Sequence, residues 1–339
     1  MPNSLIADFG IKKSILTALL LGILLGLSTT LLFNRLSTTP ISEFKEVRSR
    51  GGYTYINPLL ECENVQSVTA RGVEEQLQPL IGKTITKLKQ AGKTDSVSFY
   101  FRDLNNGPWI GINEEELHSP ASLVKIPIAI TIYKLSEENP NLLSTVIHND
   151  SDEDISEQNV KPERSLQANK DYTIDELIEL MLVYSSNGAY DMLSTYLNTN
   201  YPNALEEVYG DLGVSLDPSF RYNPAGNILS VKQYASFFRV LYNSSYLSKN
   251  NSENMLALLS KSTYVEGLRA GVPDQVEVAH KFGERVFEET NKKQLHDCGV
   301  VYAPKTPYLL CVMTKGDELS KLSEVISTIS AITYRTISQ

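Results

Sequence analysis

"HSPASLVKIPIAI", residues 118–130, predicts the beginning of a buried helix. Ser119 can cap this helix, Pro120 suits a first-turn position because its missing N–H costs nothing there, and an apolar run follows. Lys125 is unexpected in that run, since a buried lysine loses hydration that only a partner or a chemical role can offset. Residues three apart share a helix face, so Lys125 can reach the hydroxyl of Ser122. The spacing therefore predicts a serine whose proton a lysine can accept.

Pro127 lies within the same predicted helix. In a helix interior it removes the hydrogen bond to the carbonyl of Leu123, at a cost of roughly 3 kcal/mol. Two interpretations follow from this position. Either the helix bends beyond Ser122, or its regular part begins late.

Composition and charge exclude several classes of function. The chain has 339 residues, 42% of them hydrophobic, and can bury one large core or two smaller ones. A net charge of -9 does not supply the clustered basic surface that nucleic-acid phosphates need. The histidines lack metal-ligand spacing, and the acidic stretch at 150–157 lacks the sixth-position glycine of a calcium loop. We therefore expect no nucleic-acid partner, no metal site and no cofactor.

An uncharged apolar run at residues 15–33 follows Lys12 and Lys13. Its length is close to the roughly 20 residues that span a bilayer, which predicts a single membrane anchor. The predicted order is residues 1–14 in the cytoplasm, the anchor at 15–33, a polar spacer at 34–60 and the main domain at 61–339. Basic residues also follow the run and weaken the positive-inside signal, so the orientation rests on the function. Whether the anchor is cleaved stays open.

The cysteines carry little information. Cys298 and Cys311 lie in strand-like runs on either side of "APKTP" and could face each other across a hairpin. Because cross-strand disulfide geometry is demanding, the sequence favours two small buried thiols. Cys62 has no evident partner in the sequence.

Hydrophobic periodicity predicts the order of the elements. Apolar residues at 77, 80, 81, 85 and 88 indicate a packing helix, and an Asn-Gly turn separates two strand patterns at 96–104 and 108–113. Helical patterns then dominate from 120 to about 260, with a capping box at Thr173 and Glu176 and another helix after Ser230. Three strand patterns, "QVEVAHKFG", "CGVVYAP" and "YLLCVMTKG", precede an amphipathic helix at the end of the chain.

This order predicts a fold of the broad α/β class, more narrowly of the α+β type. One antiparallel five-stranded sheet is flanked by the terminal helices, and an all-helical lobe is inserted between its second and third strands. A cleft is expected where the lobe meets the sheet.

Three short stretches carry the candidate chemistry, at a helix start, after a helix and in a late strand. They are Ser122-x-x-Lys125; Ser185, Ser186 and Asn187 in "YSSNG"; and Lys281, Phe282 and Gly283 in "HKFGE". In this order they resemble the S-x-x-K, S-D-N and K-T-G elements of the penicillin-recognising serine hydrolases. The layout from about residue 95 to 336 is most similar to the class A β-lactamases.

The resemblance implies a catalytic role for three residues. Ser122 would attack an acyl carbonyl, and Lys125 would take its proton if burial and a nearby cation lower the pKa of the lysine. Ser185 would pass the proton to the leaving nitrogen. An isolated Ser-x-x-Lys occurs by chance on many surface helices, and Ser185 could belong to an ordinary turn. The combination of the three motifs favours the functional interpretation.

The resemblance also implies a set of substrate-binding groups. Asn187 would hydrogen-bond the amide of the substrate's side chain, and Lys281 would bind a substrate carboxylate and polarise Ser185. Gly283 belongs to the same motif. The backbone N–H groups of Ser122 and Glu284 would form the oxyanion hole.

The sequence departs from the class A pattern at three places. Ser186 replaces an aspartate that supports the site, and we expect little loss from this change. Phe282 replaces a hydroxyl residue that assists carboxylate binding, which predicts an altered substrate. The segment 213–230 has no match to the E-x-x-L-N element that supplies the deacylation base, and Asp217 is a weak substitute. Without that base the acyl-enzyme should form and then persist.

His280 is the remaining candidate for catalysis. A Ser-His-Asp triad is not favoured, because no G-x-S-x-G element is present and His280 adjoins Lys281 in a strand pattern. We interpret it as a structural histidine.

We therefore predict a monomeric, membrane-anchored serine acyl hydrolase outside the cytoplasm. Ser122 would be acylated by β-lactams or by peptidoglycan peptides. A penicillin-sensitive D-alanyl peptidase and a non-hydrolytic sensor of β-lactams or cell wall remain as alternatives.

Overall fold

The computed structural model describes residues 43–48, 52–65, 71–150, 159–214 and 226–338. The predicted anchor at 15–33, residues 151–157 of the acidic stretch at 150–157, and Asp217 lie outside these residues. In the part of the chain that is described, no helix is long and apolar enough to cross a membrane. The chain divides into two units, residues 1–44 with 64–67 and residues 45–63 with 68–339, and the five-stranded sheet and its helices belong to the second.

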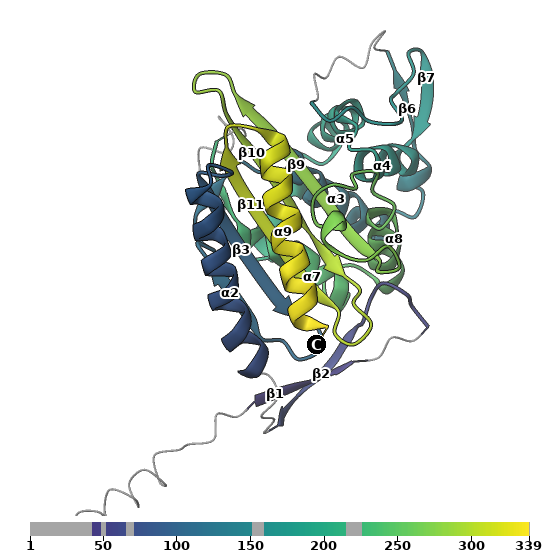
Figure 1. Cartoon of the computed structure of the whole chain (residues 1–339). Helices are drawn as coiled ribbons and strands as arrows, with labels where there is room; N and C mark the ends of the chain where they lie inside the picture. Colours follow the sequence, from purple (N-terminus) through teal and green to yellow (C-terminus); the bar gives the residue numbers. More distant parts are fainter. Residues whose placement is uncertain (1–42, 49–51, 66–70, 151–158, 215–225, 339) are drawn as a thin grey trace, which may run out of the picture. The chain divides into compact units, whose positions relative to one another are not determined.

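A five-stranded antiparallel sheet has the order β4-β3-β11-β10-β9 (Figure 1). Its strands are β3 (Ser96–Asp103), β4 (Trp109–Ile112), β9 (Val278–Phe287), β10 (Lys292–Val301) and β11 (Tyr308–Gly316). The predicted sheet is thereby confirmed. The β3–β4 hairpin turns at Gly107, whose φ of 91° explains the preference for glycine there. Strand β10 begins six residues before the predicted strand at Cys298. Strand β9 lies at the edge of the sheet.

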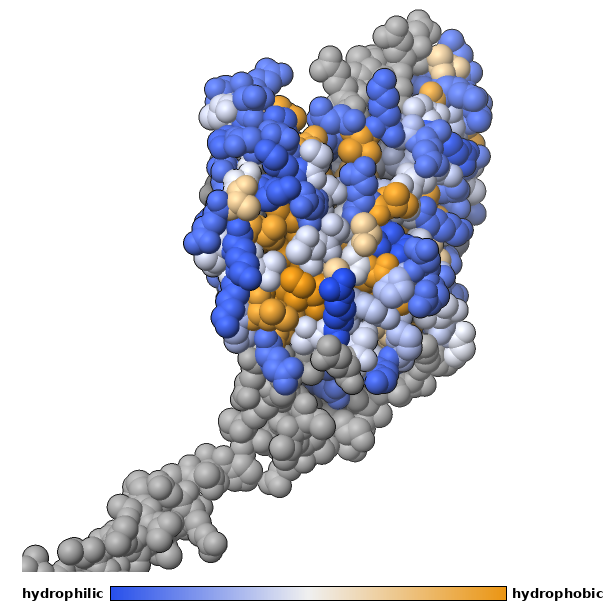
Figure 2. Space-filling model, in the orientation of Figure 1, coloured by the Kyte–Doolittle hydropathy of each residue, from blue (hydrophilic) through white to orange (hydrophobic). Residues whose placement is uncertain are grey.

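Helices α2 (Arg71–Gln90) and α9 (Leu319–Ile337) cover one face of the sheet (Figure 1). Leu77, Ile81, Leu322 and Ile326 are fully buried in the core between these helices and the strands. Leu80, expected on the same face, is 42% exposed because it lies beside the stripe that residues 77, 81 and 85 form. Figure 2 shows this side of the molecule, where hydrophilic residues predominate at the outer parts and hydrophobic residues appear mainly towards the middle.

The helices of the inserted lobe are α3 (Lys125–Glu138), α4 (Ile174–Val183), α5 (Asn187–Asn200), α6 (Ala204–Asp211), α7 (Val231–Asn243) and α8 (Lys249–Leu259). The opposite face of the sheet contacts α7 and α8 of the inserted lobe, and the other helices of the lobe share the same hydrophobic core. Helix α4 begins with the predicted capping box of Thr173 and Glu176, and α7 begins with a second one formed by Ser230 and Gln233. The predicted helical insertion is confirmed, but it is not all-helical, because short strands also lie within it.

Six further short strands form three two-stranded sheets in the described residues. β1 (Glu43–Arg48) pairs with β2 (Leu59–Val65). β5 (Leu117–His118) pairs with β8 (Leu229–Ser230), and β6 (Val146–Asn149) pairs with β7 (Lys170–Thr173). The β5–β8 pair fixes the chain immediately before the stretch that contains Ser122.

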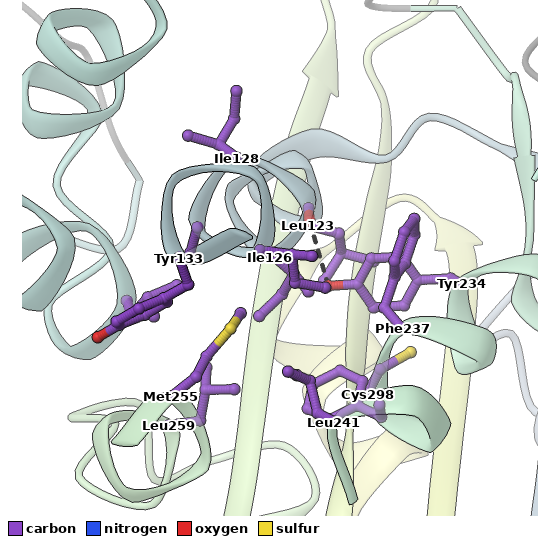
Figure 3. Packing of buried hydrophobic residues seen from close by; sticks show 14 of the residues in the cluster. Leu123, Ile126, Ile128, Tyr133, Tyr234, Phe237, Leu241, Met255, Leu259 and Cys298 are labelled. Atoms are coloured by element: carbon purple, nitrogen blue, oxygen red, sulfur yellow. Dashed lines mark hydrogen bonds between the residues drawn. The ribbon is translucent and has the colours of Figure 1, made fainter. Parts of the chain in front are cut away.

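The start of α3 corrects one expectation and settles another. Ser119 does not cap the helix; Pro120 stands at the N-cap of a preceding 3₁₀ turn, η1 (Ala121–Val124), and α3 begins at Lys125. Pro127 therefore lies in the first turn of α3, where a missing N–H is tolerated, and the late-start interpretation holds. The phenol of Tyr234 donates a 3.1 Å hydrogen bond to the Leu123 carbonyl, as Figure 3 shows.

Cys298 and Cys311 are joined by a disulfide between β10 and β11. The sequence favours two small buried thiols, and that expectation is wrong. The two residues are direct partners in the antiparallel register, with Cα atoms 4.0 Å apart. Directly opposite positions of this kind bring the side chains close enough to bond.

Candidate active site

Ser122 and Lys125 lie where the 3₁₀ turn η1 continues into α3. In 3₁₀ geometry side chains three apart eclipse each other, which puts Lys125 on the same side of the turn as Ser122. Ala121, just before the serine, has a left-handed backbone with φ of 48°. Ser122 is partly exposed, whereas Lys125 is only 1% exposed. The turn thus presents the serine to solvent and keeps the lysine inside.

Two side chains of β10 hold the backbone just before this turn. The N–H of Ser119 donates to Gln294 Oε1 at 3.0 Å, and His296 Nε2 donates to the Ser119 carbonyl at 3.0 Å. His296 can donate there because its Nδ1 accepts from the N–H of Thr314. Burial, and then the neighbouring His118, hold the pKa of His296 well below its usual range, so the ring stays neutral. Sequence analysis missed this clamp, by which Gln294 and His296 hold the Ser119 backbone. The available signal was that the two residues alternate in "KKQLHD", since alternate residues of a strand share one face.

The second motif connects α4 to α5. Ser185 has a left-handed backbone with φ of 58° and is 3% exposed. Ser186 caps α5 by accepting a hydrogen bond from the N–H of Ala189, which is the supporting role expected of it. Lys125 Nζ donates to the Ser185 carbonyl at 2.6 Å, to Ser185 Oγ at 3.3 Å and to Asn187 Oδ1 at 2.7 Å. The first and second motifs therefore meet at the Lys125 ammonium.

Lys281 brings the third motif to the same point. Its side chain on β9 is fully buried, and Nζ donates to Ser185 Oγ and to the Phe282 carbonyl, both at 2.8 Å. Burial lowers the pKa of Lys281 to about 7, although the nearby carboxylates of Asp297 and Glu284 act in the opposite direction. Both protonation states of this lysine are therefore accessible near neutral pH. Ser185 Oγ lies between two buried lysines.

Gly283 allows β9 to pass close to the turn that carries Ser122. A Cβ added at this glycine would lie 3.0 Å from the backbone nitrogen of Ser122 and 3.1 Å from that of Leu123. Both contacts are to backbone and cannot yield as a side chain would. A residue without a side chain is needed for this approach.

The neighbouring Glu284 is held through its side chain. Its Oε1 accepts a 2.8 Å hydrogen bond from the N–H of Val160, while Oε2 is buried without a hydrogen-bond partner among the described residues. Glu284 thereby connects β9 to the segment 159–165.

A cavity of about 790 Å³ opens beside these groups. Its lining includes Ser122, Ser185, Asn187, Phe282 and Glu284, together with residues of the segments 159–165 and 285–288. The predicted site residues therefore lie around one cavity, with Lys125 and Lys281 reaching Ser185 behind it. Sequence analysis did not identify the segment 159–165 as part of the lining, because nothing in its pattern marks it.

His280 lies outside this group of contacts. Its Nδ1 is 2.8 Å from Asp297 Oδ1, both side chains are buried, and Asp297 Oδ2 also accepts from the N–H of Leu268. This pairing agrees with the structural interpretation of His280. Within the described ranges, no cluster of side chains is arranged to hold a metal ion.

Comparisons with known proteins agree with this arrangement. The family model described as the Beta-lactamase enzyme family matches residues 74–337. A class A beta-lactamase from Mycobacterium abscessus is 22% identical, with a TM-score of 0.65 over 76% of this chain and 100% of its own. PBP-A is 20% identical, with a TM-score of 0.63 over 79% and 96%. A PBP-A mutant, described as an acyl-enzyme complex with penicillin G, is 21% identical, with a TM-score of 0.63 over 77% and 97%. No curated protein sequence matches the chain.

Proposed function

Because the chain belongs to the Beta-lactamase enzyme family and is a serine hydrolase, we propose that Ser122 is its nucleophile and that β-lactams acylate it. The observation that carries this proposal is the meeting of Lys125 and Lys281 at Ser185 beside a cavity that Ser122 lines. A serine hydroxyl is a weak nucleophile at neutral pH, and a neighbouring base is what activates it.

Lys125 is the base that the geometry favours for acylation. Its ammonium is held by two oxygen acceptors, the Ser185 carbonyl and Asn187 Oδ1, on the side of the turn where Ser122 lies. In its neutral form the amine accepts the proton of Ser122 as the hydroxyl attacks the carbonyl carbon.

Proton delivery to the leaving nitrogen falls to Ser185. Its Oγ is 2.8 Å from Lys281 Nζ and 3.3 Å from Lys125 Nζ, so the hydroxyl can pass a proton on and be reprotonated. A lysine with a pKa near 7 suits this task, because it exchanges protons readily at neutral pH.

The negative charge that develops on the substrate oxygen requires donors that are already in place. The backbone N–H groups of Ser122 and Glu284 are the proposed pair. Gly283 keeps β9 close to the Ser122 amide, which supports this assignment. Loss of one such donor typically costs about 3 kcal/mol of transition-state stabilisation.

Hydrolysis of the acyl-enzyme is proposed to be slow. The segment 213–230 lacks the E-x-x-L-N element, and residues 215–225 lie outside the described part of the chain. The same observation favours a second candidate function, a peptidase that penicillins inhibit by leaving a persistent acyl group. The similarity to a PBP-A mutant that is described as an acyl-enzyme complex with penicillin G supports a β-lactam as the acylating reagent.

The domain is proposed to work as a monomer outside the cytoplasm, attached to the membrane through residues 15–33. The disulfide between Cys298 and Cys311 supports this location, since disulfides persist mainly in oxidising compartments. Peptidoglycan peptides would then be accessible as natural substrates.

Intact-mass spectrometry of the purified full chain, followed over time with penicillin G, tests the proposal. We expect a covalent adduct on the wild type that lasts for hours, and none on Ser122→Ala. Ser144→Ala, which changes an exposed serine in η2 (Leu142–Ser144), serves as the matched control and should retain the adduct. An adduct that disappears while penicillin is consumed would identify a β-lactamase with efficient turnover. Absence of any Ser122-dependent adduct would refute acylation by β-lactams.

A further inference from the structure

The ammonium of Lys281 contacts two hydrogen-bond acceptors and one aromatic ring among the described residues. It carries three N–H donors and is fully buried. Ser185 Oγ and the Phe282 carbonyl each accept at 2.8 Å, and the centre of the Phe282 ring lies 4.3 Å from Nζ. A cation this close to an aromatic face is attracted by the ring quadrupole. The contacts of the ammonium are thus satisfied without a substrate.

Phe282 is itself fixed in this position. Its ring stacks on that of Tyr264, with centroids 4.1 Å apart and planes 20° from parallel, and it is 5% exposed. Phe282 also lines the cavity next to Ser122. A substrate group that approaches Lys281 from the cavity therefore meets an immobilised aromatic ring, which offers no hydrogen-bond donor to a carboxylate.

Glu284 adds a second obstacle to an anionic group. Its carboxylate lines the same cavity two residues along β9, and one of its oxygens is buried without a partner among the described residues. A second carboxylate placed nearby in this partly dry site would be repelled.

We propose that this site selects acyl donors with no carboxylate at the position that faces Lys281, and that Phe282 sets this preference. The inference rests on the proposed acylation of Ser122 and narrows its substrate class. Among β-lactams, the preferred reagents carry an ester or amide in place of the ring carboxylate. Among peptides, they are cleaved at an internal amide rather than beside a free terminal carboxylate.

The acyl transfer itself is the ordinary one. The Ser122 Oγ–carbonyl bond forms, the carbon–nitrogen bond of the lactam or peptide breaks, and the nitrogen receives a proton through Ser185.

Two other cations, Lys161 and Arg285, line the outer part of the cavity, so the test must separate them from Lys281.

The test compares penicillin G with its methyl ester, which differ only in the carboxylate. The second-order rate of Ser122 acylation is measured by intact mass for the wild type, Phe282→Thr and Phe282→Leu. The leucine variant keeps an apolar side chain and removes the ring, in case threonine impairs folding. Phe287→Thr, the same change on the same strand but outside the cavity lining, is the matched control.

We expect the wild type and Phe287→Thr to react with the ester faster than with the acid, by about threefold or more. Phe282→Thr should favour the acid by roughly ten- to a hundredfold, the value of a charge-assisted hydrogen bond of about 1.5–3 kcal/mol. Phe282→Leu should fall between them, because it frees one side of the ammonium without adding a hydroxyl.

Equal rates with the two reagents, or a wild-type preference for the acid, would overturn the inference and leave the proposed function intact. If Arg285→Gln or Lys161→Gln then removed that preference, the carboxylate receptor would be the outer cavity and not Lys281. An unchanged acid-to-ester ratio in both Phe282 variants would also overturn it. If neither reagent gave a Ser122-dependent adduct, the proposed function and this inference would fall together.

Discussion

The helical side and the strand side of the cavity differ in how closely they follow the class A pattern. On the helical side, Ser122, Lys125, Ser185 and Asn187 keep the expected residue types, and hydrogen bonds link Lys125 to Ser185 and Asn187. On the strand side, β9 keeps Lys281 and Gly283 but carries an aromatic ring and a carboxylate next to them. The groups proposed to move protons are thus retained, whereas Phe282, next to Lys281 in the cavity lining, has changed.

The difference teaches that substrate recognition can change separately from proton transfer, even though Lys281 of β9 is proposed to serve both. Proton transfer depends on contacts of about 3 Å around Ser185, which tolerate little variation. Recognition depends on side chains along an edge strand, where one residue can change without moving the backbone. The four predictions that follow test this separation.

The largest effect is expected at Lys125, on the helical side. Lys125→Ala should slow acylation of Ser122 by about a thousandfold, within the range that a positioned general base contributes. The rate is measured by the intact-mass time course with penicillin G. Lys134→Ala changes an exposed lysine of the same helix and should react like the wild type. A decrease of less than tenfold in the acylation rate of Lys125→Ala would show that another group acts as the base.

On the strand side, Gly283→Ala should slow acylation by roughly ten- to a hundredfold, because the new methyl group pushes β9 away from the Ser122 amide and weakens the oxyanion hole. It should also destabilise the fold by about 1–3 kcal/mol, as overpacking does. The intact-mass time course with penicillin G measures the acylation rate, and urea unfolding measures the stability.

The control for this change is Gly82→Ala, in α2, where an added Cβ meets nothing within 4 Å. It should stabilise the protein by about 0.5–1 kcal/mol, since alanine is the better helix former. Equal behaviour of the two glycine variants would show that β9 is not held close to Ser122.

The sequence predicted the architecture well because the strongest periodic segments were also the buried ones. The helices after Thr173 and Ser230 begin at their capping boxes, and the strands of the sheet follow the runs that predicted them. The three motifs also met as expected, since each is short and chemically distinctive.

The errors came from features that depend on register. The disulfide needs Cys298 and Cys311 to be direct partners, and nothing in a single strand shows which residue stands opposite it. For the same reason the Ser119 clamp was missed, because Gln294 and His296 come from a strand 175 and more residues away.

A smaller effect, on stability, is expected from the buried charge of the strand side. The pKa of Lys281 is about 7 in the folded protein against an ordinary 10.5, so the unfolded chain binds the proton more readily between these values. Burial of the charged Lys281 therefore lowers the free energy of unfolding by its full amount below about pH 7. This destabilisation fades as the pH rises to 10.5.

Lys281→Met removes that penalty and should raise the free energy of unfolding at pH 6 by about 1–3 kcal/mol, with little change at pH 10.5. Urea unfolding at the two pH values measures it, with the exposed Lys134→Met as control. The same variant should lose acylation, so stability and activity would move in opposite directions. A variant less stable at pH 6 would show that the hydrogen bonds of Lys281 outweigh the cost of its burial.

The smallest effect is expected at Gln294, which acts on Ser122 only through the backbone of Ser119. Gln294→Ala leaves the Ser119 N–H without its acceptor and should cost about 1–2 kcal/mol of stability. Because the turn then holds Ser122 less firmly, acylation at saturating penicillin G should slow by about fivefold while the half-saturating concentration stays unchanged. Gln78→Ala, at an exposed position of α2, should alter neither quantity. If the half-saturating concentration rose instead, Gln294 would contribute to substrate recognition. The strand side would then recognise the substrate through β10 as well as β9.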